Sequence, residues 1–171
     1  GSDTCAGSDA ITVSDGNMTN TATVTIIAIE GWENGMGSWT THNDSGGDFN
    51  AHEISETQRV SPTHSYYVEG KGLGVNGWML SRSMTSAYVY SISFWQYWDY
   101  TSPGNDSIHT YLYINGSQFC SLPVSEDTDK NIWVYRTVTI NQNVTSIGFF
   151  YDNYCAPDKM YIDDILVKTW N

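Results

Sequence analysis

Two acidic segments near the ends of the chain carry the residues best suited to chemistry. Glu33 stands in the run 31–39, and Asp163 and Asp164 stand inside the apolar run 161–167. An isolated carboxylate among apolar side chains is costly to desolvate. A Ca²⁺ ion shared by the two segments would remove that cost, because calcium accepts carboxylate and carbonyl oxygens in flexible geometry. The alternative is that Asp163 and Asp164 merely straddle an exposed strand edge.

These acidic segments, together with a third segment between them, resemble a known group of domains. The group contains the MAM domains, the cleaved-adhesin domains of bacterial surface proteins and many jelly-roll carbohydrate-binding modules. The resemblance runs from about residue 31 to residue 167 and rests on the order and spacing of three short motifs. The motifs are Trp-Glu-Asn-Gly at 32–35 followed by Trp39, Pro-Thr-His-Ser-Tyr-Tyr-Val at 62–68, and Tyr-Ile-Asp-Asp-Ile at 161–165.

The resemblance implies a fold, a metal ion and a class of function. Members of the group are two-sheet jelly rolls that often hold a structural calcium ion, and they bind glycans or proteins or mediate adhesion. Glu33 matches the opening glutamate of the pattern, and Asp163 or Asp164 matches the closing acid. The segment around Ser65 matches the loop that can lend backbone oxygens. The resemblance therefore implies a calcium site at Glu33, Ser65, Asp163 and Asp164.

The charge balance excludes several classes of partner. The 171 residues include 19 Asp and Glu against 7 Lys and Arg, which gives a formal net charge of −12. Nucleic acids and anionic membrane surfaces select basic surfaces, so neither is an expected partner. Calcium and neutral glycans are compatible with an acidic chain. No stretch resembles a transmembrane segment or a signal peptide, so we expect no membrane insertion.

Cysteines and glycosylation sequons bear on the compartment. Cys120 ends one strand-like run and Cys155 follows another, which predicts a disulfide between them and leaves Cys5 free or paired outside the chain. Five N-x-S/T sequons in a lysine-poor chain indicate an extracellular protein with glycosylation acceptors. The sequons begin at Asn17, Asn43, Asn105, Asn115 and Asn143.

Alternating apolar and polar residues place these groups on β-strands. No stretch repeats apolar residues at the i, i+3, i+4, i+7 spacing of a helix, whereas β-branched and aromatic runs between Gly, Asn, Ser and Asp are frequent. The pattern predicts an all-β, two-sheet antiparallel jelly-roll sandwich with an N-terminal β-hairpin extension. Strands of the sandwich are expected near 29–33, 37–42, 50–59, 64–70, 77–84, 88–100, 109–115, 118–122, 132–141, 145–153 and 159–169.

The N-terminal part of the chain differs from the rest. Strand-like runs at 9–13 and 21–27 flank the turn residues 14–17, and they resemble the closing hairpin of the immunoglobulin-like or cadherin-like repeats of microbial surface proteins. An isolated hairpin is marginal in water. We therefore expect residues 1–28 to pack on the sandwich of residues 29–171, to complete a missing domain, or to add a strand to another copy in a homopolymer.

Tryptophans and tyrosines alternate with core residues in three of the expected strands. A period of two puts Ile92, Phe94 and Trp98 on the inner face of the strand 88–100 and its other aromatic residues on the outer face. Two later strands repeat this pattern. The outward residues of the three strands include Trp95, Tyr97, Tyr111, Tyr113, Trp133 and Tyr135.

If the three strands share a sheet, these six side chains pave one side of it. Flat rings with polar tips offer CH–π stacking and hydrogen bonds to a pyranose, and protein interfaces are enriched in the same residues. Three interpretations follow: a glycan-binding platform, a protein interface, or a face that loops or the N-terminal hairpin cover.

Catalysis finds little support in the sequence. The four histidines are scattered, and neither a nucleophile elbow nor a phosphate-binding glycine loop is present. We therefore predict a non-catalytic extracellular binding module, stabilised by calcium, that binds a carbohydrate or a cell-surface protein. The alternative is a structural adhesin or a surface filament subunit that is joined to its neighbour through the N-terminal strand.

Overall fold

The described part of the chain is built of β-strands. The structure, a computed structural model, describes residues 7–14, 19–30, 32–43, 51–70, 75–100, 108–125, 127–154 and 158–170. Within these ranges there is no helix that could cross a membrane. In chain order the strands are β1 (Gly7–Ser14), β2 (Thr19–Glu30), β3 (Trp39–Asn43), β4 (Ala51–Ser55), β5 (Ser65–Glu69), β6 (Val75–Asp99), β7 (Ile108–Ile114), β8 (Ser117–Leu122), β9 (Trp133–Tyr154) and β10 (Lys159–Trp170).

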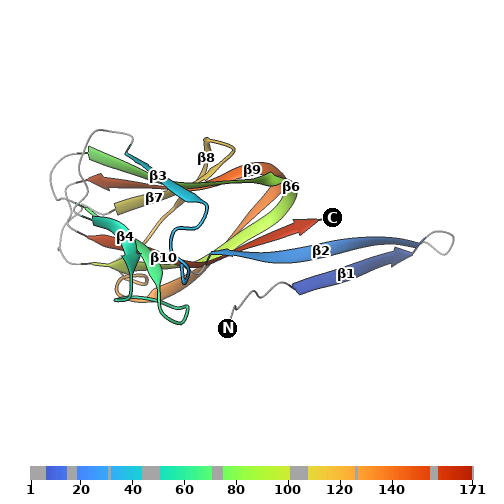
Figure 1. The fold of residues 1–171 in the computed structure, drawn as a ribbon, viewed down its shortest axis with the longest axis horizontal. Coiled ribbons are helices and arrows are strands. Elements are labelled where there is room, and N and C mark those ends of the chain that lie inside the picture. The colour runs from blue at the N-terminus through green and yellow to red at the C-terminus, as the bar shows by residue number, and fades with distance from the viewer. Residues whose placement is uncertain are drawn as a thin grey trace.

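The strands form two layers that share the long strands β6 and β9 (Figure 1). Layer A has the order β1-β2-β10-β6-β9 and uses the C-terminal half of β6 and the N-terminal half of β9. Layer B has the order β3-β6-β9-β7-β8 and uses the other halves. β4 and β5 extend layer A, because β5 pairs with Lys159–Ile162 of β10 while β2 pairs with Ile165–Trp170. This arrangement confirms the predicted all-β jelly-roll sandwich.

β6 and β9 are longer than the sequence predicts. The expected strands 77–84 and 88–100 are one strand, β6, and the expected strands 132–141 and 145–153 are one strand, β9. The pairing of β6 with β9 shifts register between Ser83 and Ala87 and again between Val89 and Ser91. Such bulges bend a strand without ending it. Since no Gly or Pro stands between these positions, no local breaker was there to end β6.

The inner faces of both layers carry the residues that alternation assigns to the core. Ile92, Phe94 and Leu112 are fully buried, and Trp98 is 2% exposed. Across the two layers the rings of Phe94 and Phe149 meet edge to face, with centroids 5.0 Å apart. The predicted register of β6 is therefore confirmed, and the side chains that alternate with these residues point away from the core.

Trp32, directly after β2, fixes the entry into the sandwich. Its fully buried ring packs against Trp39 and Tyr66, with centroid distances of 5.6 and 5.2 Å. Its indole Nε1 donates a 3.0 Å hydrogen bond to the backbone carbonyl of Ile162 in β10. Because this bond ties the turn to β10, the next residue, Glu33, is held beside the same strand.

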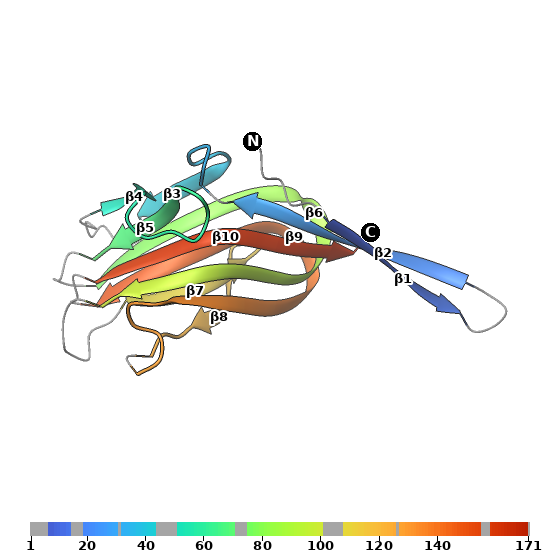
Figure 2. The same cartoon turned by 90° about the horizontal axis from the view of Figure 1, so that it is seen from below.

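β1 and β2 form the predicted N-terminal hairpin, and β2 continues into layer A. β2 pairs with β10 from Val24 to Glu30, and with β1 from Thr19 to Ile26. Between Thr19 and Val24, β2 therefore pairs with β1 alone, and the two strands form a ribbon that extends beyond the paired part of β10 (Figure 2). The hairpin is joined to the sandwich through a shared strand, while the part of the ribbon in which β2 pairs with β1 alone stands away from it.

Candidate functional site

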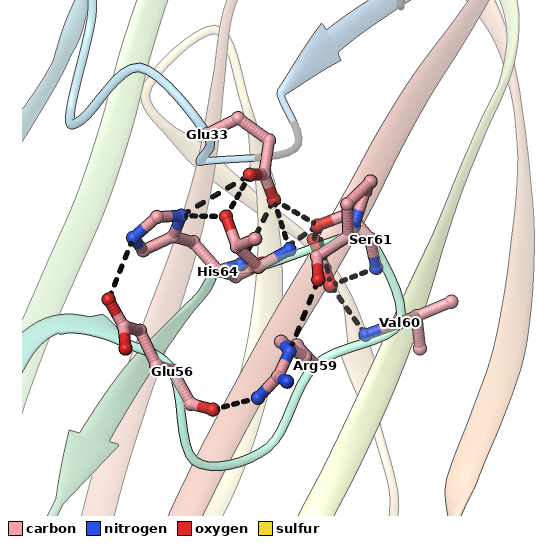
Figure 3. Close-up of polar contacts among 9 residues, drawn as sticks. Glu33, Glu56, Arg59, Val60, Ser61 and His64 are labelled. Atoms are coloured by element: carbon pink, nitrogen blue, oxygen red, sulfur yellow. Dashed lines mark hydrogen bonds and ion pairs between the residues drawn. The ribbon is translucent and has the colours of Figure 1, made fainter.

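A hydrogen-bonded cluster joins the two acidic segments through the loop between β4 and β5 (Figure 3). Glu33 Oε1 accepts hydrogen bonds from the backbone N–H groups of Thr63 at 3.0 Å and His64 at 2.9 Å. Glu33 Oε2 accepts a hydrogen bond from the Thr63 hydroxyl and lies 3.3 Å from His64 Nδ1. Both oxygens of this carboxylate are therefore engaged by one loop.

Asp163 is the buried centre of this cluster. Its side chain is fully buried on β10, and its Oδ2 accepts hydrogen bonds from the N–H groups of Val60 at 2.8 Å and Ser61 at 2.9 Å. Its Oδ1 accepts the N–H of Asp164 at 2.8 Å. The Ser61 hydroxyl lies 2.9 Å from Asp163 Oδ1 and 3.1 Å from Glu33 Oε1. The interpretation of an exposed strand edge is therefore wrong for Asp163, whose desolvation is compensated by backbone and hydroxyl donors.

The same contacts set the ionisation of the two acids. Desolvation raises the pKa of Glu33, but the hydrogen bonds from Thr63 and His64 outweigh it and hold the pKa at about 2. Burial also raises the pKa of Asp163, and there the hydrogen bonds from Ser61 and its neighbours only oppose the shift. Glu33 is therefore the firmly ionised member of the pair.

The third carboxylate of the cluster, that of Asp164, differs from the other two in its hydrogen bonding. Asp164 lies at a bulge of β10 with a left-handed φ of 47°, and its side chain is half-buried. In the described part of the chain, no hydrogen bond reaches its carboxylate. Burial, followed by the charges of Asp163 and Glu33, raises its pKa to about 6. Three carboxylates thus lie close enough to repel one another, and Asp164 has no donor to offset the repulsion.

The cluster fits a hard cation in charge and in ligand type. Calcium prefers oxygen ligands, and Asp164 offers a carboxylate without a donor beside Glu33 and Asp163. Those two acids already accept hydrogen bonds, and the described residues contain no group of three or more His, Cys, Asp or Glu side chains that could hold a metal ion. The hydroxyl of Ser65 donates to the carbonyl of Gln58, while the expected role of the Ser65 segment, to lend backbone oxygens, stays a prediction. A bound ion would therefore strengthen a contact between the two acidic segments that hydrogen bonds already make.

The residue types did not predict which groups donate hydrogen bonds to Glu33 and Asp163. The motif at 62–68 marks the right loop, but it points to Ser65, whereas the contacts come from Val60 to His64. Four of these contacts are made by backbone N–H groups, each of a different residue. Which N–H group faces an acid depends on the path of the loop, and no side chain encodes it.

Outward-facing aromatic side chains form a row across layer A. Tyr67, Tyr161, Tyr97 and Trp133 are successive cross-strand neighbours on β5, β10, β6 and β9. Their ring centroids lie 5.2, 5.7 and 5.4 Å apart along the row. Cross-strand aromatic pairs at such distances stabilise a sheet as well as forming a surface.

A second aromatic pair, Trp95 and Tyr135, lies beside this row. The two residues are in register on β6 and β9, with centroids 5.0 Å apart. Tyr135 is 48% exposed, and Trp95 and Trp133 are half-buried, whereas Tyr97 is only 9% exposed and Tyr161 only 2%. Trp95, Trp133 and Tyr135 therefore present ring surface to solvent, and the buried Tyr97 packs against Trp133.

Tyr67 and Tyr161 were missing from the predicted aromatic set. Burial, followed by a hydrogen bond from the Tyr67 hydroxyl to Glu53 at 3.2 Å, raises the pKa of Tyr67 to about 12. Tyr161 is predicted from the sequence only as part of the acidic motif at 161–165. The alternation of side chains along this strand places Tyr161 on the same face as Asp163, and this alternation is the signal that could have identified Tyr161 as an outward-facing residue.

Tyr111 and Tyr113 belong to a different surface. Both pack against Phe150 in layer B, with centroid distances of 6.3 and 5.8 Å. β7 pairs with the C-terminal half of β9, whereas Trp133 and Tyr135 lie at the other end of β9. The expectation that all six aromatic residues pave one side of a sheet is therefore wrong, because β9 takes part in both layers.

Of the three cysteines in the sequence, Cys120 lies in the described part of the chain. Cys120 on β8 is a free, half-buried thiol in this structure, and burial raises its pKa. Its expected disulfide partner, Cys155, lies outside the described residues, as does Cys5.

Two of the sequon asparagines meet beside layer B. Asn115, in the turn between β7 and β8, has a left-handed φ of 53°. Its side-chain amide donates a 2.9 Å hydrogen bond to the carbonyl of Asn143, and its Oδ1 accepts the N–H of Thr145 at 2.7 Å. Both asparagines are exposed, and the side-chain amide of Asn115 is engaged in these hydrogen bonds. Of the other sequons, Asn43 ends β3, while Asn17 and Asn105 lie outside the described residues.

Comparison with known proteins identifies relatives of the fold. No family model matches the chain, and no curated protein matches its sequence. The module TmCBM61, solved with β-1,4-galactotriose, is 17% identical with a TM-score of 0.53, over 80% of this chain and 92% of that one. The family 11 carbohydrate-binding module from Clostridium thermocellum, solved with a β-1,3-1,4-mixed-linked tetrasaccharide, is 15% identical with a TM-score of 0.54, over 83% and 94%. The K1 cleaved adhesin domain of Lys-gingipain from Porphyromonas gingivalis W83 is 17% identical with a TM-score of 0.62, over 88% and 99%.

The chain has the fold of these β-sandwich proteins. The predicted resemblance to carbohydrate-binding modules and cleaved-adhesin domains is therefore confirmed at the level of architecture. At these sequence identities the likeness describes the fold alone.

The charge repulsion at Asp164 predicts a pH-dependent effect of Asp164→Asn. A carboxyl group whose pKa is raised from 3.8 to about 6 on folding destabilises the fold as the pH rises through that window. Asparagine removes the charge and tolerates a left-handed φ. In chelator, Asp164→Asn should therefore raise the free energy of unfolding at pH 7 by about 1–2 kcal/mol, after allowance for solvent screening, and by much less at pH 4. Urea unfolding at the two pH values measures this, and an equal effect at both would contradict it.

Proposed function

We propose that the chain is a non-catalytic extracellular binding module whose ligand is a carbohydrate, bound on the outer face of layer A. The observation that carries the proposal is the placement of Trp95, Trp133 and Tyr135 side by side on that face, with ring surface exposed to solvent. A pyranose presents C–H groups that stack on such rings and hydroxyl groups that hydrogen-bond to their polar tips.

Two further observations support a sugar ligand. Two of the structurally similar proteins were solved with bound oligosaccharides. The ring of Trp133 also packs against the buried Tyr97, and the rings of Trp95 and Tyr135 pack against each other. A ring held in place before binding loses little conformational entropy when a sugar stacks on it.

Binding without catalysis agrees with the acids on this face. Glu53 accepts the hydrogen bond of Tyr67, and Glu69 lies 3.7 Å from Lys159 Nζ. These two carboxylates are therefore occupied by neighbouring side chains. The similar sugar-bound structures are likewise binding modules, which supports the same role here.

Loss of either exposed ring should weaken sugar binding. Trp95→Ala and Tyr135→Ala should each weaken the affinity for an oligosaccharide about tenfold or more, because aromatic anchors at binding surfaces contribute about 2 kcal/mol or more. A glycan array finds the sugar, with β-1,4-galactotriose and a mixed-linkage tetrasaccharide among the first probes, and calorimetry measures the variants.

Tyr111→Ala is the matched control for this experiment. It removes a half-buried tyrosine ring from the outer face of layer B and should leave the affinity unchanged. An equal loss in Tyr111→Ala, or no binding of the wild type to any glycan on a broad array, would contradict the proposal.

We further propose that calcium stabilises the contact between the two acidic segments. Asp164 would bind the ion, and the charge of the ion would offset its repulsion from Glu33 and Asp163, which keep their hydrogen bonds to the loop. The support for this is the half-buried carboxylate of Asp164, whose pKa is raised to about 6 by burial and by its two acidic neighbours.

Removal of calcium should lower the melting temperature. At 100 times its dissociation constant, an ion that binds only the folded state adds about 2.7 kcal/mol, which is several degrees for a domain of this size. The Asp164→Asn variant should lose this calcium-dependent rise in melting temperature. Equal melting temperatures of the wild type in calcium and in chelator would refute the calcium proposal and leave the hydrogen-bonded cluster intact.

A second candidate function is a structural one, in which β1 joins one copy of the chain to the next. β1 is an edge strand of eight residues, Gly7–Ser14, and its pairing with β2 contains no bulge. It also contains no Lys or Pro, two residue types that protect exposed edges from pairing with another chain. A second copy could therefore add a strand at this edge.

Deletion of residues 1–18 tests the structural role. The full chain should form assemblies visible by electron microscopy and light scattering, and the truncated chain should be monomeric, because β2 still pairs with β10 from Val24 onward. Trp95→Ala serves as the control that keeps the assembly. A full chain that stays monomeric at high concentration would exclude this function.

A further inference from the structure

The outer face of layer A contains a shallow hollow next to the exposed aromatic pair. The hollow has a volume of about 370 Å³, at the lower end of the range for small-ligand sites. It crosses β2, β10, β6 and β9, which lie side by side in Figure 2. Tyr135 lines it and at the same time contacts Trp95, so the hollow and the aromatic surface are continuous.

Four hydroxyl-bearing residues and one lysine are among the residues that line the hollow. They are Ser91 and Ser93 from β6, Thr137 and Thr139 from β9, and Lys168 from β10. The Ser93 and Thr137 hydroxyls are 2.9 Å apart and hydrogen-bonded to each other. No Asp or Glu is among the lining residues. A chain with a net charge of −12 thus has a recess without negative side chains.

Lys168 differs from the other cationic side chains in the described part of the chain. Each of the others has a partner within the protein, whereas Lys168 has neither an ion pair nor a hydrogen bond there. Its ammonium group is therefore available to a ligand. The partnered cations are Arg59 with the carbonyls of Glu56 and Pro62, Arg82 with the carbonyl of Ile29, Lys130 over the ring of Tyr100, Arg136 with Asp129, and Lys159 with Glu69.

Charge is separated along the outer face. Glu69 and Lys159 pair at the end of layer A near β5, and Asp99 lies opposite Lys159 in register. The hollow lies toward the other end of β10, at Leu166 and Lys168. A ligand with one anionic group would be repelled by the acids near β5 and attracted to the end with Lys168.

We infer that the hollow is a subsite for an anionic sugar unit, with a uronate carboxylate against Lys168 and the sugar hydroxyls against the Ser and Thr side chains. The inference rests on the proposed function, because the neighbouring unit of the same glycan would stack on Tyr135 and Trp95. It narrows the ligand from carbohydrates in general to glycans that contain an acidic residue. A lysine–carboxylate hydrogen bond is charge-assisted, and serine and threonine hydroxyls can both donate to and accept from a sugar.

The test compares trigalacturonate with its fully methyl-esterified form, which has the same sugar backbone without the charge. The wild type should bind the acid more tightly, and added NaCl should reduce this preference. In Lys168→Met the ratio of the two affinities should fall about tenfold, as expected for the loss of a hydrogen bond to a charged group. Lys168→Arg should keep the preference. The matched control is Lys159→Met, which changes the paired lysine of the same strand and should leave the ratio unchanged.

The outcomes separate this inference from the proposed function. If the ester binds as tightly as the acid, or if the preference for the acid persists in Lys168→Met, the anionic subsite is refuted while sugar binding stands. If neither oligosaccharide binds and a broad glycan array is also negative, the proposed function fails and the subsite with it. If Lys168→Met removes the preference while Lys159→Met and Lys168→Arg keep it, the inference is confirmed.

Discussion

The fold depends on how the buried carboxylate of Asp163 is compensated. A charge buried without partners costs several kcal/mol, a large fraction of the 5–15 kcal/mol, roughly, that stabilises a domain. Here backbone N–H groups of Val60 and Ser61 point at one of its oxygens. The loop that supplies them is held in turn by Glu33, and Glu33 is held by the buried Trp32 beside it. One charge on β10 thereby fixes the loop between β4 and β5 and the start of the sandwich.

The two long strands connect this cluster to the aromatic outer face of layer A. β6 and β9 each contribute one half to layer A and the other to layer B. Their inner residues, such as Phe94 and Phe149, form a continuous core across both layers. The outward residues of the same strands therefore stand on a rigid support, which favours a preformed surface for stacking. The row of Tyr67, Tyr161 and Tyr97 adds a second packed layer outside the core.

β10 arranges three kinds of charge along one strand. At its start Lys159 pairs with Glu69, in its middle Asp163 and Asp164 form the acidic cluster, and near its end Lys168 lines the hollow. The bulge between Asp163 and Leu166 changes the register, so Leu166 and Lys168 pair with Ser93 and Ser91. The same irregularity that gives Asp164 its left-handed backbone therefore also brings Lys168 to the outer face.

The local features of this protein can be predicted from its residues, whereas the packing of the strands sets which of these features come into contact. Alternation with a period of two correctly predicted the inward Phe94 and the outward Trp95, because each strand residue takes its direction from the pleat alone. It wrongly grouped Tyr111 with Trp95, because no local pattern says which half of a shared strand β7 will pair with. The acidic motif marked Asp163, but its donors are backbone groups of a distant loop that residue types do not encode. In the same way, Lys168 looked like any other surface lysine until the packing of four strands surrounded it with hydroxyls and gave partners to every other cation in the described ranges.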